Sequence, residues 1–170
     1  RQQKAFVHSA VVSPDNKFVM VSDLGTDRIH SYKLEADNGR IADATVPFVE
    51  VKPGSGPRHF AFHPSGKFAY SAEELTATVA VFDYDKTTGA LTVKQDSVTS
   101  LPAGFTGSNS SADIHVSPNG NFLYMSHRGH NSIAIFSIDK NGLIKHIGNQ
   151  DTKGKIPRNF MIDKTGDFLF

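Results

Sequence analysis

Apolar residues recur along the chain in short alternating runs that form units of about 50 residues. Each unit has an anchor after an apolar segment, and the four anchors are Pro14, Pro64, Pro118 and Lys164. Four positions after them lie Phe18, Phe68, Phe122 and Phe168. Six, fifteen and eighteen positions after the first three anchors lie Met20, Tyr70 and Tyr124, then Ile29, Val79 and Ile133, then Tyr32, Phe82 and Phe136. The alignment needs no gap, so the chain is predicted to repeat one structural unit.

Every unit has the pattern of consecutive β-strands. In the second unit, the apolar segment FAF leads into a Pro-Ser-Gly turn, then into KFAYSA and TVAVFDY, and then into a turn at Gly89. Period-2 alternation with β-branched and aromatic residues indicates strands, and no segment sustains a helical period. We predict an all-β fold of four-stranded antiparallel blades, a β-propeller, with a stacked β-solenoid as the alternative. The predicted blades are 5–52, 57–104, 111–152 and an incomplete 157–170, in one partial propeller domain, 1–170.

The length of the chain predicts an incomplete ring. At about 50 residues per blade, 170 residues supply roughly three and a half blades, and a propeller closes only with several. An isolated half ring would expose apolar blade faces, so we expect pairing with further blades or with a second chain. Because half of the channel lining would then be absent, we expect the isolated chain to be inactive.

Composition and charge exclude several function classes. The net charge is +1, there is no cysteine, and 38% of the residues are hydrophobic, in short runs. This pattern argues against a nucleic-acid partner, a membrane partner, a cysteine nucleophile and a thiolate metal site. No signal peptide, phosphate-binding loop or nucleophile elbow is visible, so we expect no cofactor and a cytoplasmic location, with export left open.

Polar residues concentrate where the first hairpin of each unit opens, opposite its turn. Strands that run to and from a turn bring residues at equal distances from it close together at the far end. Residues five or six before and nine or ten after the anchors therefore share one rim of the predicted ring. The rim residues are His8 and Asp23, then Arg58, His59, Glu73 and Glu74, then Asp113, His127 and Arg128, then Arg158.

Two interpretations of this rim are open. Polar strand ends can simply meet water, with Arg and Glu paired across a hairpin. Alternatively, several arginines at one structural position suit an anionic small molecule, because guanidinium binds carboxylate or phosphate in a bidentate way. Asp113 and His115 lie on one strand face and could hold a metal, although a hydrogen-bonded core histidine is the simpler expectation. The segment Asp23–Arg28 is predicted to be a turn in which Asp27 and Arg28 pair in part.

The motifs GPRHFAFHP, YSAEEL, SADIHVSPNGNFLYMSHRGHNSIAIFSID and PRNFMID resemble those of seven-bladed propeller lactonases. These include bacterial propeller-type 6-phosphogluconolactonases and the fungal carboxymuconate cyclases. The resemblance implies that the chain covers about half of a seven-bladed ring with a site in the channel mouth. The family residues carry over to His8, Arg58, Glu74 and Arg128, with His8, Glu74 and Arg128 taken as catalytic. Two departures are Glu73 and His127, which replace the usual Asn before Glu and the usual Asn or Asp before Arg.

These residues suggest hydrolysis of a sugar-acid lactone, foremost 6-phosphoglucono-1,5-lactone. The arginines at 58, 128 and 158 would hold the phosphate and polarise the carbonyl, and Glu74 or His8 would deprotonate water. His59 would orient the substrate or act as the alternative base, and the other expected substrate-binding residues are Asp113 and His127. No metal or cofactor is required. The alternatives are a muconate-type cyclase or isomerase on the same rim, and a non-catalytic propeller that binds protein.

Overall fold

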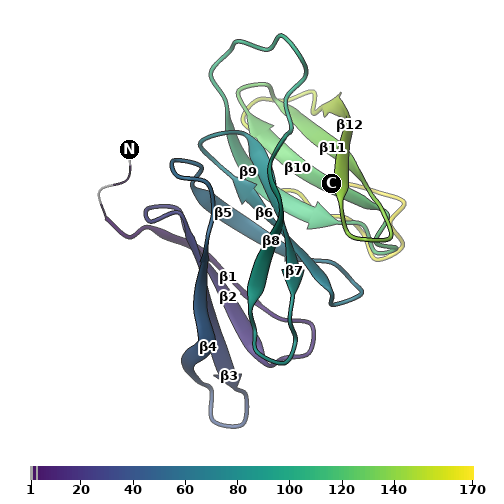
Figure 1. Cartoon of the computed structure of the whole chain (residues 1–170). Helices are drawn as coiled ribbons and strands as arrows, with labels where there is room; N and C mark the ends of the chain where they lie inside the picture. Colours follow the sequence, from purple (N-terminus) through teal and green to yellow (C-terminus); the bar gives the residue numbers. More distant parts are fainter. Residues whose placement is uncertain (1, 3) are drawn as a thin grey trace.

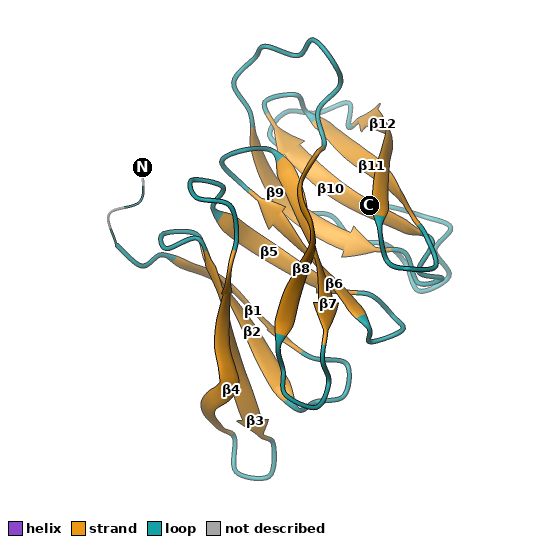
Figure 2. Cartoon of the chain, viewed as in Figure 1, coloured by secondary structure: helices purple, strands orange, loops and turns teal. Residues whose placement is uncertain are grey.

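The computed structural model describes residue 2 and residues 4–170, and within them every regular element is a β-strand (Figure 2). Twelve strands form three four-stranded antiparallel sheets, each with its strands in chain order. The sheets follow one another from the N-terminal to the C-terminal side of the molecule (Figure 1).

The first sheet contains β1 (Val7–Val12), β2 (Phe18–Asp23), β3 (Arg28–Glu35) and β4 (Arg40–Glu50). The second contains β5 (Pro57–Phe62), β6 (Phe68–Glu73), β7 (Thr78–Tyr84) and β8 (Leu91–Thr99). The third contains β9 (Ser110–Val116), β10 (Phe122–Arg128), β11 (Ser132–Ile138) and β12 (Ile144–Asp151). The predicted four-stranded meander is confirmed.

The anchor turns have one shared geometry. The amide of the residue before each anchor donates to the carbonyl of the phenylalanine four positions after that anchor, at 2.8–3.0 Å. The four bonds join Ser13 to Phe18, His63 to Phe68, Ser117 to Phe122 and Asp163 to Phe168. The last segment therefore begins the same hairpin, although it forms only an isolated bridge between Ile162 and Leu169.

The core lies between neighbouring sheets and uses the repeated apolar positions. Met20 and Ile29 of the first sheet pack with Phe60 and Phe82 of the second. Between the second and third sheets, an equivalent buried cluster contains Tyr70, Val79, Val81, Leu123 and Phe136. Stacking of sheet faces buries the apolar side of each blade, because one blade alone has no partner for that face.

Glycines in the outer turns allow the sheets to approach closely. A Cβ on Gly89 would lie 2.3 Å from the Phe18 ring, and one on Gly142 would lie 2.3 Å from the Phe68 ring. Both glycines also have positive φ, +75° and +78°. The same contact thus joins the first sheet to the second and the second to the third.

No helix in the described part of the chain is long and apolar enough to cross a membrane.

Candidate functional site

The first strand of each sheet lies on the inner side of the array. These strands are β1, β5 and β9, and β5 lies between the other two. Each carries one extra residue relative to its partner strand, which makes a β-bulge. The bulges fall at His8 in β1, at Arg58 and His59 in β5, and at Ala112 and Asp113 in β9. Bulges interrupt the ladder and redirect side chains, so the predicted rim positions are also the positions where the strands are irregular.

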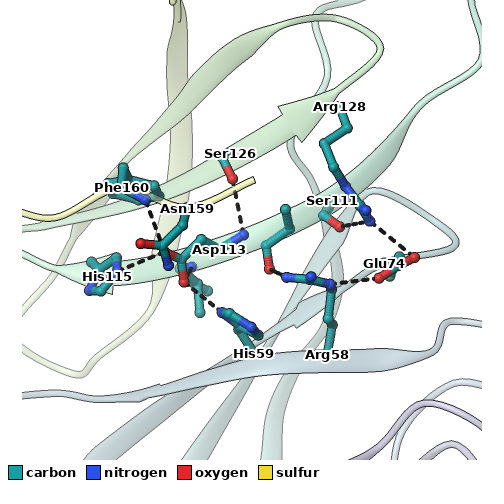
Figure 3. Close-up of polar contacts among 12 residues, drawn as sticks. Arg58, His59, Glu74, Ser111, Asp113, His115, Ser126, Arg128, Asn159 and Phe160 are labelled. Atoms are coloured by element: carbon teal, nitrogen blue, oxygen red, sulfur yellow. Dashed lines mark hydrogen bonds and ion pairs between the residues drawn. The ribbon is translucent and has the colours of Figure 1, made fainter. Parts of the chain in front are cut away.

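Glu74 holds two arginines at this rim (Figure 3). Its Oε2 lies 2.7 Å from Arg58 Nε, and its Oε1 lies 3.0 Å from Arg128 Nη2. The Arg58 side chain is 2% exposed, whereas those of Arg128 and Glu74 are 15% and 20% exposed. The structure therefore brings together three of the predicted residues, with Arg58 deepest.

Backbone carbonyls of β9 fix both guanidinium groups. Arg58 Nη1 donates to the Ala112 carbonyl at 2.6 Å, and Arg128 Nη2 donates to the Ser111 carbonyl at 2.9 Å. Burial and the nearby charge of Arg128 lower the pKa of Arg58, yet a guanidinium stays charged at any physiological pH. The cluster is a rigid pair of cations that share one carboxylate.

A second polar cluster is centred on the buried Asp113 (Figure 3). Asp113 Oδ1 lies 2.6 Å from His59 Nδ1, and its Oδ2 lies 3.0 Å from His115 Nε2. Oδ2 also accepts hydrogen bonds from Asn159 Nδ2 at 2.6 Å and from the Phe160 amide at 3.1 Å. Burial alone would raise the pKa of Asp113, but the hydrogen bonds from His115 and His59 outweigh it and hold that pKa well below its usual range.

His8 and Arg158 lie beside these two clusters. The His8 and His59 rings meet edge to face, with centroids 5.5 Å apart. Burial, together with the charges of Arg58 and His59, lowers the pKa of His8, so its imidazole is neutral near pH 7. Arg158 is exposed and close enough to Arg58 to lower the pKa of Arg58.

His127 and Glu73 lie away from the solvent side of the rim. Both are buried, His127 at 0% and Glu73 at 1% exposure. His127 Nδ1 lies 3.0 Å from Asn109 Nδ2, and burial lowers its pKa to about 4. Glu73 Oε2 accepts from the Ser55 hydroxyl at 2.8 Å, and burial raises its pKa to about 8. Residues of the described chain therefore cover both side chains.

The predicted pairing of Asp27 with Arg28 is wrong. Arg28 pairs instead with Glu50, at 2.8 Å across the β3–β4 pair. Asp27 accepts from the amides of Gly54 and Gly56, at 2.7 and 2.9 Å, in the segment that leads to Arg58. The two residues are adjacent where β3 begins, and adjacent side chains of a strand point to opposite faces, so they do not pair with each other.

Sequence reasoning missed the roles of Asn159, Ser126 and Ser111. Asn159 occupies the same repeat position as His59 and Asp113, which was its only signal. The Ser126 hydroxyl accepts from the bulged Asp113 amide at 3.0 Å, and the bulge that frees this amide leaves no mark in the residue pattern. As for a metal, the described residues contain no group of three or more His, Asp or Glu side chains arranged to hold one.

The chain matches a known protein family along its whole length. Residues 1–170 match the family described as lactonase, 7-bladed beta-propeller. A 6-phosphogluconolactonase of Formosa agariphila is 43% identical over 99% of this chain and 48% of its own length. A 6-phosphogluconolactonase of Bacillus subtilis is 37% identical over 99% of this chain and 47% of its own length. The chain thus spans about half the length of the curated relatives it matches.

Two solved structures have the same fold as this chain over nearly its whole length. The periplasmic gluconolactonase of Pseudomonas aeruginosa superposes with a TM-score of 0.88 at 34% identity, over 97% of this chain and 46% of its own. A protein of Lactobacillus plantarum superposes with a TM-score of 0.90 at 36% identity, over 97% and 47%. The bladed architecture, the repeat and the family match together show that this chain belongs to the seven-bladed β-propeller lactonase family.

Proposed function

We propose that the protein containing this chain hydrolyses a sugar-acid lactone, most specifically 6-phosphoglucono-1,5-lactone to 6-phosphogluconate. The observation that carries the proposal is the cation cluster at the rim, in which Glu74 joins Arg58 and Arg128 beside the His59–Asp113 pair. Fixed guanidinium groups beside an imidazole supply both parts of ester hydrolysis, namely stabilisation of an oxyanion and removal of a proton from water. The names of the relatives support the same reaction.

The burial of each group suggests its role. Arg58 is almost completely covered, so we assign it to holding Glu74 and the β9 backbone rather than to a direct phosphate contact. Arg128, which is partly exposed, would face the developing oxyanion, and the exposed Arg158 would bind the phosphate or carboxylate of the substrate. Lactones are activated esters, so positioning and charge stabilisation need no covalent nucleophile.

Glu74 is better suited to organising the cations than to accepting a proton. Each of its two oxygens already lies against a guanidinium group, so neither oxygen is free to take a proton from water. The imidazoles of His8 and His59 are the remaining candidates for the base.

Exchange of Glu74 for glutamine tests the site. In the complete gene product, Glu74→Gln should lower kcat for 6-phosphoglucono-1,5-lactone by on the order of 10²-fold, because the two guanidinium groups lose their shared carboxylate. The matched control is Glu73→Gln, one residue earlier and buried away from the rim, which should retain activity. Equal activity of both variants would refute the site.

A cytoplasmic location and independence from cofactors stay predictions. The periplasmic gluconolactonase among the structural relatives shows why location needs its own measurement. Fractionation of cells that produce the complete protein, and assay after dialysis against a chelator, would test them.

A further inference from the structure

His59 is the one rim imidazole in the described chain that a buried carboxylate orients. Asp113 comes from the neighbouring sheet and is held by five donors, so its position is fixed from several sides. Its Oδ1 faces His59 Nδ1 and the Ile114 amide, and its Oδ2 faces His115 Nε2, Asn159 Nδ2 and the Phe160 amide. Every partner can donate, and this arrangement stabilises the ionised carboxylate.

The ionised carboxylate determines the tautomer of His59. A carboxylate without a proton only accepts, so His59 Nδ1 carries the hydrogen of this 2.6 Å bond. In neutral His59 the lone pair therefore lies on Nε2. Among the described residues Nε2 has no hydrogen-bond partner, and the side chain is 26% exposed. The atom that can accept a proton is thus unpaired within the described chain, on a side chain that reaches solvent.

The other candidate bases lack this combination. Both Glu74 oxygens are paired with arginines. The buried Nδ1 of His8 has no partner within the described chain, so no carboxylate orients that ring. His115 shares Asp113, but it lies two residues further from the rim and its ring packs against Phe160, with centroids 4.7 Å apart.

We propose that His59 Nε2 is the general base of the hydrolysis and that Asp113 is the positioning residue that fixes its tautomer. This inference rests on the proposed lactone hydrolysis and names the proton acceptor within it.

One imidazole can both accept and return the proton that the reaction transfers. A water oxygen bonds to the lactone carbonyl carbon while Nε2 takes one proton of that water, and the carbonyl electron pair moves onto oxygen to give an oxyanion. The carbonyl then re-forms, the ring carbon–oxygen bond breaks, and the leaving oxygen takes the proton back from Nε2. The product is the open-chain hydroxy acid, whose carboxyl proton passes to solvent, and His59 ends neutral.

The rate should then follow the protonation of His59. Neutral His59 is the active form, so kcat should rise with pH and reach a plateau. The charged and titratable groups around His59 are His8 from β1, Arg58 from its own strand, and Asp113 and His115 from β9, with Glu74, Arg128 and Arg158 around Arg58.

The test uses the complete gene product and 6-phosphoglucono-1,5-lactone. His59→Gln should lower kcat by on the order of 10²-fold or more with little change in KM, and it should remove the acid limb. Asp113→Asn should lower the plateau and keep an acid limb, because His59 is still present but its tautomer is no longer fixed. His63→Gln, which removes an imidazole from the turn at the other end of β5, should keep the wild-type profile.

Chemical rescue separates a catalytic role from a structural one. Added imidazole should restore part of the kcat of His59→Ala, since the emptied position is open to solvent. A His59→Gln variant with wild-type kcat, or a His59→Ala variant that imidazole fails to rescue and that keeps the acid limb, would overturn the assignment. A wild-type protein that does not hydrolyse the lactone would overturn the proposed function and this inference together.

Discussion

Glu73 and Glu74 are neighbours with opposite environments. Glu73 ends β6 and is buried against Ser55, whereas Glu74 follows at the rim between two arginines. Successive residues of an extended strand point to opposite sides, so only one of the two can face the channel. The same alternation buries His127 and leaves Arg128 at the rim.

The buried Glu73 should make stability fall as pH rises. Burial raises its pKa from 4.5 to about 8, so between these values the folded protein binds the proton that the unfolded chain releases. Glu73→Gln should flatten this slope and raise the free energy of unfolding at pH 7 by up to about 3 kcal/mol. Denaturant unfolding from pH 5 to pH 8 would measure it, with the exposed Glu35→Gln as control. Parallel slopes for Glu73→Gln and wild type would contradict the assignment.

Arg158 should decide affinity for the anionic end of the substrate. It is exposed beside the buried cation cluster and is the most accessible of the three rim arginines. Arg158→Gln should raise KM for 6-phosphoglucono-1,5-lactone about tenfold and leave KM for the unphosphorylated lactone nearly unchanged. Lys155→Gln, a neighbouring exposed cation, serves as the control. An equal change for both lactones would argue against a phosphate contact.

At the scale of the element, the sequence pattern predicted strands and turns well because these repeat. The anchors and the phenylalanines four positions later gave the hairpins, and the closing hydrogen bond recurs in all four units. The bulges at His8, Arg58 and Asp113 could not be predicted, since they arise from one extra residue in a ladder and have no residue signature. Because the bulges cannot be predicted, the sequence pattern gives the positions of Glu73 and His127 along their strands but not the burial of their side chains.

The outer turns should control packing between sheets. A side chain at Gly142 would meet both a positive φ and the Phe68 ring. Gly142→Ala should therefore lower the free energy of unfolding by about 2–4 kcal/mol. Gly66 also has positive φ, +66°, but nothing lies within 4 Å of an added Cβ, so Gly66→Ala should cost only about 1 kcal/mol. Equal losses for the two variants would show that the contact with Phe68 has no effect.

At the scale of the whole molecule, both ends of the array carry exposed apolar side chains. Phe6 and Val7 are exposed at the start of the first sheet, and Phe168 and Phe170 are exposed in the last hairpin. Faces of this kind in the interior of the array are covered by the next sheet. Further blades or a second chain would cover the ends in the same way, and this stays a prediction. The chain has about half the length of its relatives, so turnover is best measured on the complete gene product.

The most direct test of the proposed lactonase activity is the initial rate of 6-phosphoglucono-1,5-lactone hydrolysis by the complete gene product, compared with the uncatalysed rate. We expect saturable turnover with a kcat in the usual enzymatic range of about 1–10³ s⁻¹. No acceleration above the uncatalysed rate, or turnover of a carboxymuconate substrate in its place, would contradict it.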